Sequence, residues 1–179
     1  MTRAWSVRLA REEDAPAIEA LIHISCHALQ KSHYSDGQIT GATGSVFGVD
    51  YQLILDRTYF LVELKLKLVG CGGWSKRKTL FGSDAMKTGV DTELNPKCDS
   101  ARIRAFFVHP EWARCGIGRQ ILQHCEEAIQ DAGFRSVELV STLTGVPFYA
   151  ACNYSEHESF DIPLANGLRL PVVRMVKQF

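Results

Sequence analysis

The segment from Arg102 to Gln130 constrains the fold more than any other stretch of the chain. In its first part, up to Val108, polar and apolar residues alternate and then become mainly apolar, as in a largely buried strand. From Gly116 onward the apolar residues recur every three or four positions, at Ile117, Ile121, Leu122, Cys125, Ala128, Ile129 and Ala132. This period predicts an amphipathic helix. The segment therefore predicts a strand, a loop and a helix in succession.

The loop between this strand and helix has the composition of an anion-binding site. Gly116 and Gly118 lie where the helix is predicted to begin, and a residue without a Cβ lets backbone N–H groups approach a ligand closely. The first-turn amides of a helix have no internal partner and lie at the positive end of its dipole. Arg114 and Arg119 flank the glycines and add positive charge. The loop therefore predicts a pyrophosphate site.

The nucleotide motifs that share this chemistry fit the loop poorly. A dinucleotide-binding fingerprint needs a third glycine where the chain has Ile121, and its glycine turn follows the strand directly. Glu138 lies about twenty residues beyond Gly118, as a ribose-binding acid would, but it is embedded in an apolar run. The phosphate-loop ATPase pattern fails because no Gly-Lys-Ser/Thr follows.

Two longer motifs resemble those of a known family. The first reads His109-Pro110-Glu111-Trp112-Ala113-Arg114-Cys115-Gly116-Ile117-Gly118-Arg119 and resembles motif A of the GNAT superfamily of acetyl-CoA-dependent N-acetyltransferases. The second reads Thr144-Gly145-Val146-Pro147-Phe148-Tyr149-Ala150-Ala151-Cys152-Asn153-Tyr154 and resembles motif B of the same family. The two motifs have the family's order and spacing, and together they are a strong signal.

The chain departs from the family pattern at two positions. Ala113 stands where the family has Gln or Arg, which leaves backbone amides and Arg114 to bind the pyrophosphate. Asn153 stands where motif B has glycine. Asparagine tolerates a left-handed backbone better than other non-glycine residues, so we expect the turn after the motif B helix to be kept.

The resemblance implies a GNAT-like α/β (α+β) fold in a single domain over residues 1–179. Its mixed central sheet is expected to have six to seven strands with splayed central strands, flanked by about four helices. A chain of this length with 46% hydrophobic residues has enough apolar material for one sizeable core. Local patterns predict strands at 5–9, 58–64, 67–75, 102–108, 135–142, 153–164 and 167–177, and helices at 12–32, 116–132 and 144–152, with shorter helical turns in 33–57.

The resemblance also implies the roles of the site residues. Tyr149 occupies the place of the family's general acid, which would protonate the departing sulfur. A bulge near Phe106 to Val108 would splay the central strand and direct its N–H groups at the acetyl carbonyl and the pantetheine arm. The residues expected to bind the coenzyme are Phe106, Phe107, Val108, Arg114, Cys115, Gly116, Ile117, Gly118, Arg119 and Thr144. The general base stays open among Glu63, Glu111, His109 and a chain of water molecules.

The acceptor side of the site is less well defined by the sequence. In the superfamily, the region between the first two strands contributes to the acceptor site, which makes Tyr34, Asp36 and Gln38 candidate substrate contacts. Trp74 either lines the acceptor cleft or belongs to the core. The long connection from 76 to 100 is predicted to be a lid, an oligomer contact or a disordered segment.

Composition narrows the function classes. A formal net charge of zero argues against a protein that binds nucleic acid or a membrane surface. The N-terminal residues resemble no signal peptide and no apolar run approaches membrane-spanning length, so we expect a cytoplasmic protein. The six cysteines are scattered without zinc-ligand or disulfide spacing, so we expect no metal. Cys115, close to a helix start, is either a reactive thiol or only a backbone contact.

Three functions are consistent with these patterns. The favoured one is an acyltransferase that moves the acetyl group of acetyl-CoA to a primary amine by direct attack in a ternary complex. Its acceptor would be a small-molecule amine or a peptide. The family resemblance also implies that the protein could form a homodimer. The alternatives are a non-catalytic acyl-CoA-binding module, which the missing side chain at Ala113 mildly favours, and a dinucleotide-binding oxidoreductase, which Ile121 disfavours.

Overall fold

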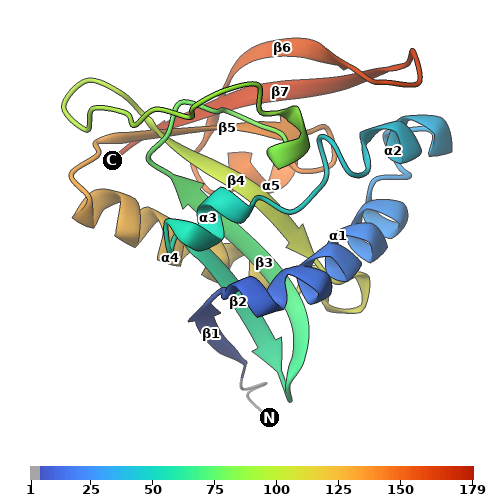
Figure 1. Cartoon of the computed structure of the whole chain (residues 1–179), viewed down its shortest axis with the longest axis horizontal. Coiled ribbons are helices and arrows are strands. Elements are labelled where there is room, and N and C mark those ends of the chain that lie inside the picture. Colours follow the sequence, from blue (N-terminus) through green and yellow to red (C-terminus); the bar gives the residue numbers. More distant parts are fainter. Residues whose placement is uncertain (1–4) are drawn as a thin grey trace.

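The computed structural model describes residues 5–179 and is built around one mixed sheet of seven strands in the order β1-β2-β3-β4-β5-β7-β6 (Figure 1). The strands are β1 (Ser6–Leu9), β2 (Tyr59–Leu64), β3 (Lys67–Ser75), β4 (Ala101–Val108), β5 (Ser136–Thr142), β6 (Ser155–Pro163) and β7 (Arg169–Gln178). The α-helices are α1 (Ala15–Leu29), α2 (Asp36–Ala42), α3 (Tyr51–Leu55), α4 (Ile117–Asp131) and α5 (Val146–Ala150). The predicted mixed α/β architecture is confirmed, with five helices where about four were expected.

Two hairpins form where the sequence predicted them. The turn between β2 and β3 has Lys65 and Leu66 at φ of 49° and 67°, the left-handed backbone that tight two-residue turns require. The turn between β6 and β7 contains Gly167 at φ of 82°. All neighbouring strands are antiparallel except β4 and β5, which are parallel.

The central strands separate soon after they meet. β4 and β5 pair only at Ala101 with Val137 and at Arg102 with Glu138. Beyond that point the register between β3 and β4 shifts, and Ala105 takes a φ of 54°, which a non-glycine residue in a strand seldom adopts. The predicted splay is therefore confirmed, with its distortion centred just before Phe106.

Helices cover both faces of the sheet (Figure 1). α1 packs on one face with a cluster that includes Leu61, and α4 packs on the other with a cluster that includes the next residue of β2, Val62. This alternation follows from the two-residue period of a strand. None of the helices in residues 5–179 has the length and apolar composition that crossing a bilayer requires.

The glycines of β3 allow α4 and the bulged part of β4 to approach that strand closely. A Cβ atom at Gly70 would lie 2.5 Å from Ile117 Cγ2, and one at Gly72 would lie 2.4 Å from the Phe106 ring. Both separations are far below van der Waals contact, so any side chain at these positions would displace the start of α4 or the bulged part of β4.

Two polar side chains near helix starts, those of Asp14 and Thr144, bind other groups and do not cap the helices that follow them. The Asp14 carboxylate does not cap α1; it accepts hydrogen bonds from the backbone N–H of Arg11 (2.7 Å) and from the Arg8 guanidinium (2.7 Å). Thr144 does not cap α5, whose N-cap residue is Gly145. The Thr144 hydroxyl lies instead 3.1 Å from His33 Nδ1.

Candidate active site

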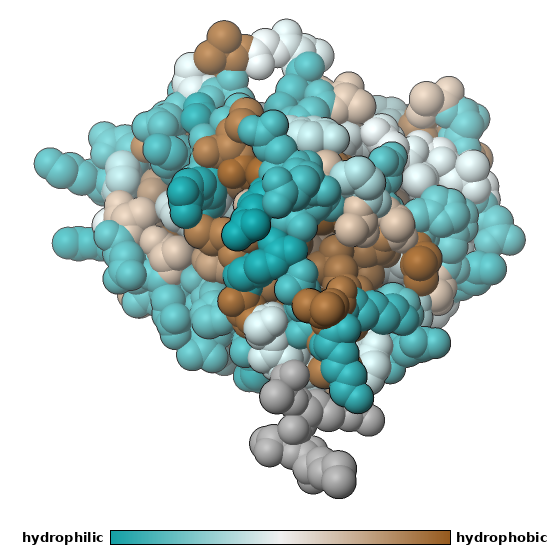
Figure 2. Space-filling view, turned by 60° about the horizontal axis from the view of Figure 1, so that its bottom comes forward, coloured by the Kyte–Doolittle hydropathy of each residue, from teal (hydrophilic) through white to brown (hydrophobic). Residues whose placement is uncertain are grey.

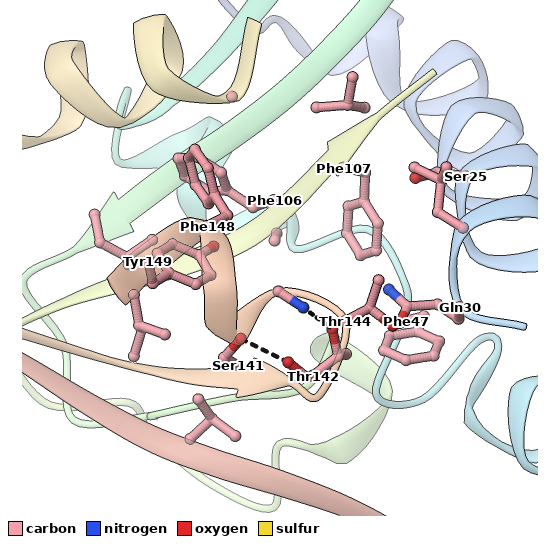
Figure 3. A pocket seen from close by; sticks show the side chains of 18 of the residues that line it. Ser25, Gln30, Phe47, Phe106, Phe107, Ser141, Thr142, Thr144, Phe148 and Tyr149 are labelled. Carbon is pink, nitrogen blue, oxygen red and sulfur yellow. Dashed lines mark hydrogen bonds between the residues drawn. The ribbon is translucent and has the colours of Figure 1, made fainter. Parts of the chain in front are cut away.

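A cavity of about 870 Å³ opens where β4 and β5 separate. One wall comes from Ile103–Val108 of β4 and the start of α4, and the facing wall comes from β5 and α5. α1 and two segments around residues 47 and 81 close its other end. Figure 3 shows Phe106, Phe148 and Tyr149 on one side of this space and Ser25, Gln30 and Phe47 on the other.

The first end of the cavity is the exposed start of α4. Gly116 is the N-cap residue at φ of 93°, and no side chain caps the helix there. The first regular helical bond joins Gln120 N to Gly116 O, so the amides of residues 117–119 have no partner within the helix. An added Cβ on Gly116 would meet nothing within 4 Å, which leaves room for a ligand against the backbone.

Most of the predicted coenzyme-binding residues border this end or the adjoining strand. The following predicted residues line the same cavity: Phe106, Phe107, Val108, Arg114, Gly116, Ile117, Gly118, Arg119 and Thr144. Cys115 is not among the residues that line it, and its Sγ donates to Ala113 O at 3.6 Å. The arrangement places two guanidinium groups and uncapped helix amides in one place, which suits an anionic group.

The middle of the cavity follows an open strand edge. Beyond Arg102 the backbone of β4 has no strand partner on its β5 side, because the ladder between these strands stops there. An unpaired strand edge can hydrogen-bond an extended ligand as a further strand would. Phe106 and Val108 therefore offer backbone groups to the cavity, while the N–H of Phe107 faces Cys71 on β3.

Tyr149 forms part of the cavity wall and is 8% exposed. Its ring packs against the rings of Phe148 (centroids 4.9 Å apart), Tyr154 (5.7 Å) and Phe106 (6.3 Å). Removal from water, with a smaller contribution from Cys125 and Cys152, raises the pKa of Tyr149 well above that of a free phenol. The Tyr149 hydroxyl therefore holds its proton more tightly than a tyrosine in water.

The turn that follows α5 is preserved in spite of its missing glycine. Asn153 adopts a φ of 68°, the left-handed conformation that glycine usually supplies. The N–H of Tyr154 then donates to Tyr149 O at 3.0 Å, which closes the helix. The expectation for Asn153 is confirmed.

None of the four candidate acceptor contacts, Tyr34, Asp36, Gln38 and Trp74, lines the cavity. Tyr34 is buried, and its hydroxyl donates to Pro171 O (2.6 Å) and accepts from Leu143 N (2.8 Å), which links three segments next to the site. Trp74 is buried in the core, with its ring edge-on to Phe134 at 6.2 Å. The structure thus agrees with the core alternative for Trp74. Gln38 likewise serves structure, since it caps α2 and donates to Arg169 O.

The candidate bases lie outside the cavity as well. Glu63 accepts from Arg8 at 2.7 Å, and Glu111 pairs with Lys67 on the surface. His109 Nδ1 accepts from Glu111 N at 3.3 Å. None of these three residues is part of the lining.

The long connection from 76 to 100 forms part of the cavity wall, a role that the sequence did not predict. Buried charges hold it in place: Arg104 Nη2 lies 2.8 Å from Asp50 Oδ2, and Lys87 Nζ lies 2.7 Å from Asp50 Oδ1. Arg104 also donates to the carbonyl oxygens of Thr79 and Gly82. Burial raises the pKa of Asp50, while the two cations oppose that shift.

Other buried groups have structural roles. Glu138 is 4% exposed and lies between Arg102 and Arg174, outside the cavity, so it does not act as a ribose-binding acid. Cys26, Cys71, Cys125 and Cys152 are buried, as expected of cysteines that pack as small hydrophobic residues. Burial raises the pKa of Cys26 and Cys71 to about 12. No cysteine lines the cavity in residues 5–179.

Comparison with known protein families gives one clear result for this region. Residues 56–156 match the model of the acetyltransferase (GNAT) domain, which is more than half of the chain and spans both motifs. The chain belongs to the GNAT acetyltransferase family. It is thus an acyltransferase, and the uncapped start of α4 is the GNAT motif A loop. A comparison with curated proteins finds no match.

Solved structures with a similar fold extend over the whole chain. A GCN5-related N-acetyltransferase from Rhodopseudomonas palustris has a TM-score of 0.74 at 18% identity, covering 100% of this GNAT chain and 99% of that one. The PaiA N-acetyltransferase of Thermoplasma acidophilum, in complex with coenzyme A, has a TM-score of 0.67 at 12% identity, covering 98% and 99%. A ribosomal-protein-alanine N-acetyltransferase from Brucella melitensis has a TM-score of 0.65 at 15% identity, covering 97% and 99%.

Proposed function

We propose that this GNAT protein transfers the acetyl group of acetyl-CoA to the primary amine of an acceptor by direct attack within a ternary complex. The observation that carries the proposal is one continuous cavity that joins the uncapped start of α4, the open edge of β4 and the phenol of Tyr149. The similar fold of a protein in complex with coenzyme A supports the choice of ligand.

The residues present fit a coenzyme A molecule. The amides of residues 117–119, together with Arg114 and Arg119, would hold the pyrophosphate, and the free edge of β4 would pair with the amides of the pantetheine arm. The methyl side chain of Ala113 cannot hydrogen-bond the pyrophosphate, so the backbone amides and the two arginines would bind it. When bound, the coenzyme supplies an acetyl group activated as a thioester.

The chain itself supplies two of the three groups that acetyl transfer needs. Backbone N–H groups of Phe106 and Val108, on the open edge of β4, are the donors that would polarise the acetyl carbonyl. The Tyr149 phenol, kept protonated by burial, is the donor for the departing sulfur. The absence of cysteine from the described lining favours direct attack by the amine over an acyl-cysteine route.

We assign the third group, the proton acceptor for the incoming ammonium, to His33. Within residues 5–179 no carboxylate lines the cavity, and the lining arginines stay protonated, which leaves this imidazole as the basic acceptor. Its Nδ1 lies 2.9 Å from the Ser32 hydroxyl and 3.1 Å from the Thr144 hydroxyl, so two contacts orient the ring.

Replacing His33 by glutamine should lower kcat/KM for the acceptor by roughly 100-fold at neutral pH, the effect of losing a general base. The acidic limb of the pH–rate profile should move to higher pH, because kcat/KM then rises only as more of the acceptor is itself deprotonated. The control is His23→Gln, which removes an exposed imidazole outside the cavity lining and should leave the profile unchanged. An unchanged acidic limb in the His33→Gln protein would show that the proton leaves by another path.

Two measurements test the proposed function. Acetyl-CoA at about 100 times its Kd should raise the melting temperature by several degrees, since such an excess adds about 2.7 kcal/mol of stability, whereas NAD should not. Thiol release from acetyl-CoA should then depend on an added amine. Binding of acetyl-CoA without turnover over a panel of amines and peptides would favour the non-catalytic module, and a shift with NAD alone would favour the oxidoreductase.

A further inference from the structure

The end of the cavity away from the α4 start is lined mainly by aromatic and aliphatic side chains. They come from the loop after α2, from the 76–100 connection and from strands on both sides of the gap: Val46, Phe47, Leu80, Phe81, Phe107, Ile162 and Val172. The rings of Phe47 and Phe107 meet edge to face at 6.3 Å. Such a surface gains free energy by removing an apolar body of an acceptor from water.

The charges around this end are already neutralised. In the described chain its lining contains no Asp or Glu, so a second ammonium group would lose its hydration without gaining a counter-ion. The buried cation at this end is Arg104, whose side chain is 2% exposed and whose charge is matched by Asp50 at 2.8 Å. A carboxylate on the acceptor would therefore find no unpaired cation here either.

One polar group at this end lacks a partner inside the protein. Gln30 Oε1 is buried and accepts no hydrogen bond from any described residue. Figure 3 shows the Gln30 side chain beside those of Phe47 and Thr144, and all three residues line the cavity. A buried acceptor without a donor costs free energy, and an N–H group of a bound amine would relieve that cost. His33, three residues along, is the proton acceptor assigned above.

We infer that the acceptor is a small monoamine whose amino group carries an aromatic or branched aliphatic body and no second charge. This inference rests on the proposed function and specifies its substrate class. The amide C–N bond forms as the thioester C–S bond breaks, and the nitrogen loses two protons. One passes to His33 before the attack; the second leaves with the collapse of the tetrahedral intermediate and replaces the proton that Tyr149 gives to the sulfur. Polyamines, aminoglycosides and free amino acids are poor acceptors for this cavity.

Thiol release at saturating acetyl-CoA measures this selectivity. We expect kcat/KM for 2-phenylethylamine and 3-methylbutylamine to exceed that for 1,4-diaminobutane, spermidine and phenylalanine by roughly 100-fold, the penalty of burying one unpaired charge. Faster turnover of a diamine, an amino acid or a peptide would overturn the inference and leave the proposed function intact.

A charge-adding variant tests the cause of the selectivity. Val46→Glu places a carboxylate in the lining and should raise the ratio of kcat/KM for 1,4-diaminobutane to that for 2-phenylethylamine about 10-fold, the scale of one partly buried ion pair. Val46→Gln is the matched control of equal shape and should leave the ratio unchanged. Leu80→Glu is the second variant, used if Val46→Glu melts below the assay temperature. An unchanged ratio in a folded glutamate variant would overturn the inference.

Calorimetry separates the inference from the proposed function. 2-Phenylethylamine should bind to the protein saturated with coenzyme A, and 1,4-diaminobutane should not, whether or not any amine is acetylated. Selective binding without turnover would reject the proposed function and keep the monoamine preference. Equal binding of both amines would reject the preference itself.

Discussion

Tyr149→Phe is expected to lower kcat for acetyl transfer by roughly 10²- to 10⁴-fold, the usual contribution of a positioned proton donor. The substitution removes one oxygen and keeps the ring, so the packing against Phe148, Phe106 and Tyr154 remains. The affinity for coenzyme A should stay within about a factor of two, because the substitution leaves unchanged the amides of residues 117–119 and the two arginines proposed to hold the pyrophosphate. Steady-state kinetics and calorimetry measure the two quantities.

The pH dependence gives the same prediction an independent readout. Because burial raises the pKa of Tyr149, the phenol stays protonated through the range in which an ordinary tyrosine ionises. The alkaline limb of the wild-type profile, up to pH 10, should therefore contain no contribution from this group. A fall in rate that disappears in the Tyr149→Phe protein would contradict the raised pKa.

Tyr154→Phe is the matched control for this experiment. Its hydroxyl donates to Glu126 at 2.9 Å and the residue lies outside the cavity lining, although its ring touches that of Tyr149. The variant should lose some stability and keep kcat. If Tyr149→Phe and Tyr154→Phe have the same kcat as the wild type, Tyr149 is only part of the cavity wall.

Asp50→Ala should lower the free energy of unfolding by about 3–5 kcal/mol, one of the largest losses expected from a single substitution in this chain. The Asp50 side chain is 1% exposed and compensates both Arg104 and Lys87. Its removal leaves a buried guanidinium without its counter-ion, and burying an uncompensated charge is far more costly than losing a surface pair. Urea unfolding at neutral pH measures the change.

Glu93→Ala is the control within the same connection. Glu93 pairs with Lys76 at 2.8 Å, but its side chain is 55% exposed, so its loss should cost less than about 1 kcal/mol. The acceptor KM should rise in Asp50→Ala and not in Glu93→Ala, since only the former releases the wall that holds Phe81 and Gly82. Equal stability of the two variants would show that water reaches the Arg104 site.

The sequence predicted the residues around the start of α4 and the open edge of β4 better than those at the far end of the cavity, for a physical reason. Motif A lies within a single strand-loop-helix unit, so short-range signals such as the Gly116 turn and the period of α4 are enough to define it. The Asn-Gly hairpin and the left-handed Asn153 are local in the same sense.

The far end of the cavity depends on contacts between distant parts of the chain. The Asp50–Arg104 pair joins residues 54 positions apart and thereby brings Phe47 and Phe81 to the same cavity. The single local indication of this pair was Arg104, an arginine within a mainly apolar strand. Its partner could not be identified from the local sequence. The contacts of Asp14 with Arg8 and of Thr144 with His33 likewise depend on the tertiary structure.

The short ladder between β4 and β5 has a mechanical consequence. The sheet is in effect two sub-sheets, β1–β4 and β5–β7, joined by two residue pairs near Ala101. Past this junction, the two sub-sheets are held together by side-chain packing and by any ligand that lies in the gap between them. A ligand bound along β4 would thus act as an eighth strand that connects the two sub-sheets. Amide hydrogen exchange in β4 and β5 should therefore slow together when it binds.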